Sequence, residues 1–325
     1  MKIIKKQHPQ KPPHGQNYYF NIRGEVSFMH KHRKSVFLFV TANKHERDAF
    51  EKRFIRMNEQ YILGKTYYLG MFGNYPVAYI HMDEQGVTNP AAAPLVSQLV
   101  QKLHPVAVIM VGIAFGTDEK RQKIGDVLIS DKILPYDSQK LLEDRTEYKE
   151  TPKEVGFQLL NAFREYREWV YYLSNSEKST VYIGAMLTGS RLINNYKYRN
   201  QLIDDFSDQK PIGGEMEGQG IYSMCRIHGV TEWIIIKGIC DWGYNKNNPN
   251  KSKNQIMAAN AAVDYCFNVF CREGVFDSLF EDACTDTCLD KYATNMDSKF
   301  VVNNYGKIKN QKNFSIKNMT GDINL

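Results

Sequence analysis

The amino-acid sequence predicts an α/β fold. It indicates a single three-layer domain, with a central mixed, mostly parallel twisted sheet flanked by helices and an extension at each end of the chain. Uninterrupted apolar runs of strand length recur along the chain, and such runs are typical of strands covered on both faces. Amphipathic segments of helical length alternate with them, which favours parallel strands joined by helices. With 325 residues, 42% of them apolar, the chain is long enough to bury one large core.

The pattern begins with an unbroken apolar run of strand length, Ser35–Thr41. Asn43 can cap a helix that reaches about Met57, because its side chain can accept the first free backbone N–H groups. Two short strands follow, Thr66–Met71 and Tyr75–His81. The Gly-Asn pair between these two strands is a hairpin signal, so we expect them to be neighbours in the sheet.

The middle of the chain continues the alternation. A helix rich in small residues is expected over Thr88–Leu103, and Val106–Val111 after it is the most strand-like run in the protein. Asp126–Ser130 is a further strand. Glu154–Leu173 reads as one long amphipathic helix, and Val181–Ala185 as the strand that follows it.

Three more elements complete the predicted body. Gly214–His228 is a helix, Trp233–Gly238 a buried strand, and Asn254–Phe270 a last helix with alanines on its packing side. We therefore place one catalytic-size domain at residues 35–274, between a basic arm at 1–34 and a tail at 275–325.

The two extensions differ from the body in composition. The arm holds eight Lys or Arg against one acid, Glu25, whereas the rest of the chain is close to neutral. A basic arm can bind nucleic acid or an acidic partner, but this one lacks the aromatic interleaving of a known binding module, so we do not expect nucleic-acid binding. The tail is rich in Asn and Lys, which is compatible with edge strands formed on a protein partner or with a flexible segment.

Several classes of protein are excluded by what the sequence lacks. No run approaches the roughly 18 apolar residues of a membrane span. The charged N-terminus has no apolar stretch behind it, so it is not a secretory signal, and we expect a cytoplasmic protein. The six cysteines are then expected to be reduced. Nothing in the sequence requires a metal or an organic cofactor.

Polar and glycine residues gather where the apolar runs end. Ligands of α/β sheets bind outside the carboxyl ends of strands, so these positions are candidates for a site. Gly112–Gly116 reads as a tight glycine turn, Asp241 follows the last strand, and Glu46 follows the first. Glu215 and Glu217 flank a methionine at a helix start. Acids there either face the positive end of the helix dipole or bind ligand hydroxyl groups.

These segments together resemble the nucleoside phosphorylase and nucleosidase superfamily, and within it the 5′-methylthioadenosine/S-adenosylhomocysteine nucleosidases. The resemblance rests on a glycine turn at 111–116, a Gly-Asp strand at 124–131, and Glu-Met-Glu at 215–217. It also rests on Cys-Asp at 240–241 and on a segment at 188–194 that is similar to the one framing the purine in the family. Each motif alone is weak, but their shared order and spacing are specific.

The resemblance implies a role for each acid in breaking the N-glycosidic bond of a purine nucleoside or nucleotide. Asp241 would act as general acid to the departing base, and Glu46 would orient and activate water. Glu217 would accept hydrogen bonds from the ribose hydroxyls while Met216 packs on the sugar, and Glu215 would mainly support the helix start. The other substrate-binding residues that the resemblance implies are Gly112, Ile113, Ala114, Phe115, Leu192, Ile193 and Cys240.

Ordinary structural roles remain open for the two catalytic candidates. Glu46 can be a first-turn helix acid, and Asp241 can cap the loop that follows it. If the acids do no chemistry, the chain is instead a binding module that senses a nucleoside or assembles through its tails.

The nucleophile is expected to be water. Phosphorylases of this superfamily resemble one another in an arginine before the glycine turn and a Ser or Thr within it, where this chain has Met110 and Ile113. Neither side chain can donate a hydrogen bond to phosphate, so a buried phosphate dianion would be unpaired. Lys44 and Arg47 keep purine nucleoside phosphorolysis open as the alternative.

The substrate and the assembly are less defined by the sequence. Lys44, Arg47 and Arg191 are candidate phosphate contacts, which suits a purine nucleotide such as ATP. The two extensions would suit a regulated effector that resembles the nucleosidase domains of bacterial defence systems. The resemblance also implies a homo-oligomer.

Overall fold

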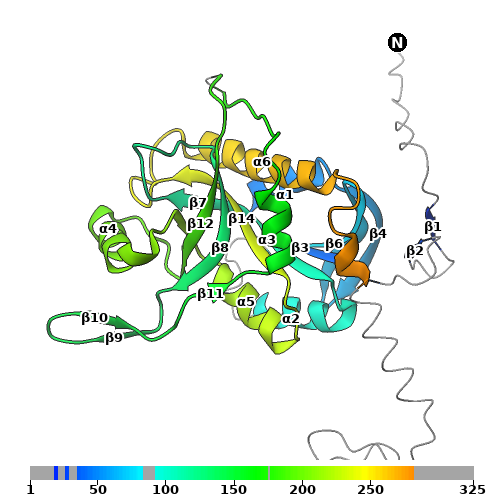
Figure 1. Ribbon diagram of the computed structural model, residues 1–325, viewed down its shortest axis with the longest axis horizontal. Helices are drawn as coiled ribbons and strands as arrows, with labels where there is room; N and C mark the ends of the chain where they lie inside the picture. Colours follow the sequence, from blue (N-terminus) through cyan, green and yellow to red (C-terminus); the bar gives the residue numbers. More distant parts are fainter. Residues whose placement is uncertain (1–17, 21–25, 29–34, 83–91, 175, 282–325) are drawn as a thin grey trace, which may run out of the picture. The chain divides into compact units, whose positions relative to one another are not determined.

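The computed structural model describes residues 18–20, 26–28, 35–82, 92–174 and 176–281 (Figure 1). In the basic arm, β1 (Tyr18–Phe20) pairs antiparallel with β2 (Val26–Phe28). The rest of the arm, and residues 282–325 of the tail for which edge strands were considered, lie outside the described residues.

The body is built on one ten-stranded mixed sheet, as the sequence predicted. Its strands are β3 (Phe37–Thr41), β4 (Ile55–Ile62), β5 (Lys65–Phe72), β6 (Tyr75–His81), β7 (Ala107–Gly116), β8 (Val127–Pro135), β11 (Lys153–Glu154), β12 (Val181–Thr188), β13 (Gly213–Glu215) and β14 (Trp233–Asp241). The spatial order is β11-β8-β12-β13-β7-β3-β6-β5-β4, and β14 pairs with both β7 and β8. A separate hairpin joins β9 (Gln139–Leu141) to β10 (Thr146–Tyr148).

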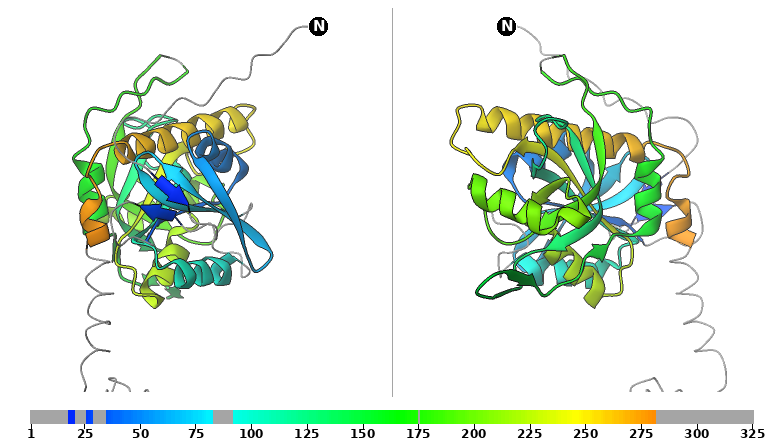
Figure 2. Two further views of the ribbon diagram at one scale, coloured as in Figure 1. Left: turned by 90° about the vertical axis from the view of Figure 1, so that its right-hand side faces the viewer. Right: turned by 60° about the vertical axis from the view of Figure 1, so that its left-hand side comes forward.

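Part of the sheet closes on itself. Strand β14 runs parallel to β7 and antiparallel to β8, while β8, β12, β13 and β7 are already neighbours in the sheet (Figure 2). The parallel strands β6, β3, β7 and β14 lie side by side, so their carboxyl ends meet at one edge. Closure brings β13 and the start of the following helix to that same edge.

Helices cover the two faces of this sheet. They are α1 (Lys44–Glu51), α2 (Ala92–Leu103), α3 (Phe157–Arg164), α4 (Tyr196–Asp205), α5 (Gly218–Ile227) and α6 (Lys251–Phe270). Figure 1 shows α1, α3 and α6 on one side and α2 and α5 on the other; α6 contacts α1 and α3, and α2 contacts α5. The expected three-layer arrangement is therefore confirmed.

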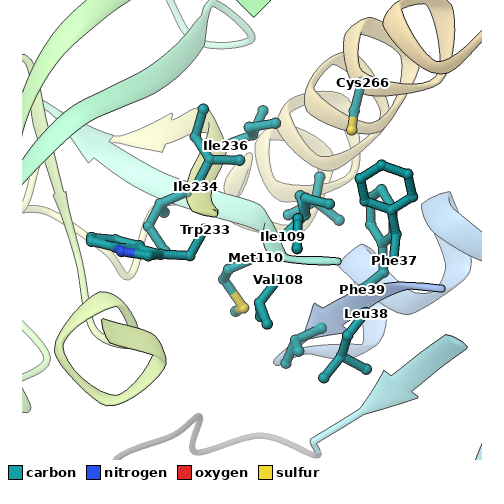
Figure 3. Close-up of a cluster of buried hydrophobic side chains, with 14 of the residues drawn as sticks. Phe37, Leu38, Phe39, Val108, Ile109, Met110, Trp233, Ile234, Ile236 and Cys266 are labelled. Carbon is teal, nitrogen blue, oxygen red and sulfur yellow. The ribbon is translucent and has the colours of Figure 1, made fainter. Parts of the chain in front are cut away.

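The core explains why the strands read as continuous apolar runs. Phe37, Leu38 and Phe39 are all fully buried, because helices cover both faces of β3 (Figure 3). The ring of Phe270 on α6 lies 4.9 Å from that of Phe37 and 5.1 Å from that of Phe39, centroid to centroid. Edge-on and tilted contacts of this kind add to the area term of burial. Strand β3 is thus fixed rigidly against α6.

The predicted helix from Asn43 to Met57 is wrong in its second half. Helix α1 ends at Glu51, and Ile55–Ile62 forms the edge strand β4, paired antiparallel with β5. The turn between these strands places Leu63 at φ 46°, in the left-handed region, followed by a glycine at φ 75°. A leucine is rarely found in that conformation, so the glycine was the only residue of this turn that gave the usual hairpin signal.

The predicted helix Glu154–Leu173 is also too long. Its described helical part is α3, which ends at Arg164, and its first residue belongs to β11. Beyond the helix, Trp169 donates its indole N–H to Asp264 on α6 at 2.8 Å and stacks on Tyr171. These contacts hold the segment in a non-helical course, so tertiary packing overrides the amphipathic pattern.

Two smaller differences affect the site and the domain boundary. Gly112–Gly116 is not a turn, because β7 runs on to Gly116 and pairs there with β13 and β14. Phe276, Leu279 and Phe280 are buried in the main core. The body therefore continues past the expected boundary at residue 274, to the last described residue.

Among the described residues, no helix combines the length and apolar character that crossing a bilayer requires.

Replacing Gly238 by alanine is expected to destabilise the protein. A Cβ at this position of β14 would lie 2.0 Å from the backbone oxygen of Ala258 on α6. Helix and strand would have to separate, which typically costs 1–3 kcal/mol. The free energy of unfolding in urea measures the loss. Gly184→Ala is the matched control, because its new Cβ would meet the movable tip of Ile212 and should cost less. Equal losses in the two variants would contradict this account of the packing.

Candidate active site

A cavity of about 210 Å³ lies at the edge where the parallel strands end. Loops and helix starts after β3, β12, β13 and β14 form its walls, together with the end of β7. Residues expected at the site that line this cavity are Glu46, Ile113, Ala114, Phe115, Arg191, Leu192, Ile193, Glu215, Met216, Glu217, Cys240 and Asp241. The structure thus brings the three acids that the sequence singled out, Glu46, Glu217 and Asp241, to one cavity.

Glu46 is buried at the start of α1 and is held by three backbone donors. Its Oε2 accepts hydrogen bonds from the N–H groups of Ala42 at 2.6 Å and Asn43 at 3.0 Å. Its Oε1 accepts one from the N–H of Ile113 at 2.9 Å. The bond from Asn43 belongs to a capping box with Asn43 as the N-cap, whose side chain in turn accepts the N–H of Glu46, so the structural role left open for Glu46 is present. The third bond ties the carboxylate to β7 and fixes it against the cavity.

Gly112 permits this approach. A Cβ at Gly112 would lie 2.2 Å from Oε1 of Glu46, which is far inside van der Waals contact. Gly112 itself does not line the cavity. A close approach to the backbone was expected at this glycine, but the group that approaches is the carboxylate of Glu46.

Glu215 and Glu217 occupy different environments, although only one residue separates them. Glu215 ends β13 and accepts hydrogen bonds from the N–H groups of Glu217 at 2.9 Å and Gly218 at 2.9 Å, at the start of α5. It therefore supports the helix start, as expected. Glu217 makes no side-chain cap bond, and its carboxylate is directed to Lys237 and the cavity.

Lys237 lies beneath the cavity, and its side chain is completely buried in β14. Its Nζ lies 2.8 Å from Oε2 of Glu217 and 3.9 Å from Oε2 of Glu215. It also interacts electrostatically with Glu46. A buried ammonium without a partner would be strongly disfavoured, so the glutamates stabilise the charge of Lys237, and Lys237 in turn stabilises theirs.

The cluster holds three carboxylates and one ammonium group, and the pKa values of Glu46, Glu215 and Lys237 are shifted. Burial raises the pKa of Glu46 above its ordinary value, with Lys237 opposing the shift and Glu217 adding to it. Burial likewise raises the pKa of Glu215 to about 7. For Lys237 burial acts in the opposite direction, but the three glutamates together raise its pKa, so the lysine keeps its charge. One cation thus faces three carboxylates, and the pKa values of Glu46 and Glu215 are raised.

Asp241 ends β14 on another wall of the cavity. Its Oδ1 accepts the N–H of Gly243 at 2.7 Å, which is the loop-capping role considered above. Its Oδ2 lies 3.1 Å from Nζ of Lys246 and 3.2 Å from Sγ of Cys240. All of these contacts come from β14 and the loop that follows it, so this loop determines how the carboxylate is presented to a ligand.

The three candidate phosphate contacts are not equivalent. Arg191 lines the cavity and donates to the hydroxyl of Tyr198 at 2.9 Å. Arg47 pairs with its neighbour Asp48 at 3.2 Å, and neither it nor Lys44 lines the cavity. Leu192 is 69% exposed although it borders the cavity, so it has apolar area available for a ligand.

Sequence reasoning missed two lysines. Lys237 interrupts an otherwise apolar strand, Trp-Ile-Ile-Ile-Lys-Gly-Ile-Cys, and a lone lysine in a strand covered on both faces must have a buried partner. That signal was present in the sequence. Lys246 lies in a loop rich in Asn and Lys, where nothing distinguishes it from its neighbours, and only the folded loop reveals its contact with Asp241.

The arrangement can stabilise opposite charges at the two ends of one ligand bond. Glu46 and Glu217 place negative charge where a sugar would become cationic, and Asp241 with Lys246 offers donors to a departing base. Among the described residues, no group of three or more His, Cys, Asp or Glu side chains is placed to hold a metal ion.

Comparison with known proteins agrees with this geometry. The sequence model of the Phosphorylase superfamily matches residues 37–268. A death domain-containing ATP nucleosidase of Amphimedon queenslandica is 26% identical over 227 residues, which cover 64% of this chain and 42% of that protein. ATP nucleosidase Cap17 of Escherichia coli strain KTE188 is 26% identical over 211 residues, covering 58% and 41%. The chain thus spans about two fifths of the length of these curated relatives.

Solved structures share the fold. The 5′-methylthioadenosine/S-adenosylhomocysteine nucleosidase of Colwellia psychrerythraea, determined with adenine, superposes with a TM-score of 0.60 at 18% identity, over 73% of this chain and 95% of that one. The corresponding enzyme of Neisseria meningitidis gives a TM-score of 0.61 at 16% identity, over 72% and 98%. At these identities the likeness concerns the fold alone.

Replacing Lys237 by methionine is expected to cost about 3–5 kcal/mol at neutral pH, because the variant leaves buried carboxylates without their cation. The loss should shrink as the pH falls, since protonation of Glu46 and Glu215, whose pKa values are already raised, removes the uncompensated charge. Urea unfolding at pH 8 and pH 5 measures both effects. Lys132→Met is the control, because it removes from β8 a lysine that forms a partly exposed pair with Glu154 of β11 and should cost at most about 1 kcal/mol. A loss in Lys237→Met that does not depend on pH would contradict this view of the cluster.

Proposed function

The chain belongs to the phosphorylase superfamily, and on that premise we propose that its cavity hydrolyses the N-glycosidic bond of a purine nucleotide. The single observation that carries the proposal is the meeting of Glu46, Glu217 and Asp241 at one cavity, from three separate strand ends. A purely structural set of acids has no reason to converge on a cavity, because unpaired charge there is costly.

Each acid has a role that its surroundings support. Glu46 has three backbone donors and faces the cavity, so it can orient a water molecule and take its proton as the water attacks the anomeric carbon. Glu217, held by Lys237, can accept hydrogen bonds from the ribose hydroxyls. Asp241, on the wall formed by the end of β14, can hydrogen-bond the purine and assist its departure. Met216, Ile113, Phe115, Leu192 and Ile193 supply the apolar lining that a purine nucleoside requires.

Water is favoured over phosphate as the nucleophile. Met110 is completely buried, and Ile113 lines the cavity with an apolar side chain next to Glu46. A phosphate dianion bound there would lie against a carboxylate and would lack charged donors. Phosphorolysis therefore remains the weaker candidate.

A nucleotide is favoured over a nucleoside. Arg191 borders the cavity and is exposed to solvent, so its guanidinium can pair with a 5′-phosphate group without a desolvation penalty being paid in advance. Two relatives that share about a quarter of their aligned residues with this chain are named ATP nucleosidases. We take ATP as the first substrate to test.

Incubation of the purified chain with ATP is expected to release free adenine at the same rate with and without inorganic phosphate, as followed by chromatography. Asp241→Asn and Glu46→Gln should each lower kcat by about 10²–10⁴, because each removes one acid–base step. Both variants should still bind the nucleotide. Arg191→Met should mainly raise KM for ATP and leave adenosine unaffected.

The same assay separates the alternatives. Adenine release that requires phosphate would reveal a phosphorylase. If wild-type protein binds ATP and liberates no base, the cavity is a nucleotide sensor. An Asp241→Asn variant that retains full turnover would remove Asp241 from the mechanism.

The pH profile of the reaction is expected to report on Glu46. A base must be ionised to act, and burial raises the pKa of Glu46 above 4.5, so kcat/KM should rise with pH through a midpoint above 4.5. Loss of the positive charge in Lys237→Met should move this midpoint higher still, because Lys237 favours the ionised form. Lys237→Arg keeps the charge and serves as the control. A midpoint at or below 4.5 in wild type, or a downward movement in Lys237→Met, would contradict the assignment of Glu46.

A further inference from the structure

The carboxylate of Asp241 is occupied by donors on both oxygens. Oδ1 accepts the backbone N–H of Gly243 at 2.7 Å, and Oδ2 is contacted by Nζ of Lys246 at 3.1 Å and Sγ of Cys240 at 3.2 Å. Both carboxylate oxygens therefore already accept from donors that the fold supplies. A departing purine, however, needs a donor, because negative charge develops on its ring nitrogens as the bond breaks.

Lys246 is the cation nearest to this acid. Among the described residues, no other Lys or Arg lies within ion-pair distance of Asp241. The side chains of the two partners are only 15% and 16% exposed, so the pair is shielded from solvent and stronger than a surface ion pair. Lys246 also lines the cavity, so its ammonium can lie close to a ligand that contacts Asp241.

The loop that carries Lys246 is fixed rather than free. The backbone N–H of Lys246 donates to Oδ1 of Asn194 at 3.0 Å. The backbone N–H of Asn195 in turn donates to the carbonyl oxygen of Gly243 at 3.0 Å. The loop after β14 is therefore tied to the segment after β12, which carries Arg191 and Leu192 of the cavity lining. Because these bonds fix the backbone of the loop, they hold Lys246 next to Asp241.

We propose that Lys246 is the positioning and proton-supplying partner of Asp241, so that the pair together protonates the departing purine. The inference rests on the proposed function, which it deepens. The C–N bond breaks with its electron pair going to the purine, and a proton of the Lys246 ammonium passes through the carboxylate of Asp241 to the base. Water forms the new C–O bond and gives its proton to Glu46. The neutral lysine and the protonated Glu46 then exchange protons with solvent, so the reaction balances as hydrolysis.

The two cavity lysines therefore have different tasks. Lys237 is enclosed by glutamates below the cavity and keeps its charge throughout. Lys246 lies on the cavity wall, in contact with the acid that faces the base. A competing role for Lys246 is contact with a substrate phosphate, and the experiment must separate this role from the proposed one.

A double-mutant cycle on ATP and adenosine tests the proposal, once wild type has been shown to release adenine. Lys246→Met is expected to lower kcat about 10²-fold on both substrates and to leave KM within a factor of about 3. Lys246→Arg should recover part of the loss, because it restores the positive charge. In an Asp241→Asn background, Lys246→Met should have no further effect, whereas in a Glu46→Gln background it should retain its full effect. Lys178→Met, an exposed lysine that does not line the cavity, is the control and should match wild type.

Three results would overturn the proposal. If Lys246→Met multiplies the loss of Asp241→Asn, the lysine does not act through Asp241. A loss confined to KM for ATP and absent for adenosine assigns Lys246 to phosphate binding. A lowered melting temperature with proportionate loss of active protein assigns it to stability. If wild type releases no base from either substrate, the proposed function itself fails, which this design distinguishes from failure of the Lys246 assignment.

Discussion

One buried ammonium group, that of Lys237, offsets the repulsion among the carboxylates beneath the cavity. Glu46, Glu215 and Glu217 are brought to the same strand ends, and three carboxylates at that depth would repel one another and lose their hydration. Lys237, on the central strand β14, lies within 2.8 Å of one and 3.9 Å of another, and it interacts with the third. The strand that carries this cation also ends in Asp241, so a single element places both the buried cation and one acid of the cavity wall.

The fold and the chemistry use the same contacts. Glu46 caps α1 and also reaches β7, and Gly112 is needed because that carboxylate presses against its backbone. Glu215 stabilises the start of α5 so that Glu217, two residues on, can face the cavity. Structural and functional readings of these acids are therefore compatible. A site built on capping interactions is rigid, which suits a reaction that depends on placing charge next to one bond.

Much of the architecture could be predicted from the sequence, because strands buried on both faces read as apolar runs and glycine and acidic residues mark their ends. The edge strand β4 and the short helix α3 could not, since a leucine at positive φ and the anchoring of Trp169 override local patterns. Convergence of the acids followed from the strand-end rule. Lys237 was recoverable as a charge within an apolar strand, whereas the contact of Lys246 depends on a loop conformation that local sequence does not encode.

A crystal structure with a C-nucleoside analogue of adenosine 5′-triphosphate, whose sugar–base bond is carbon–carbon and resists hydrolysis, tests the central claim most directly. The account predicts the ribose hydroxyls on Glu217, the purine edge on Asp241 and an ordered water between Glu46 and the anomeric carbon. An analogue bound elsewhere, or one whose sugar lies away from Glu46 and Glu217, would contradict it.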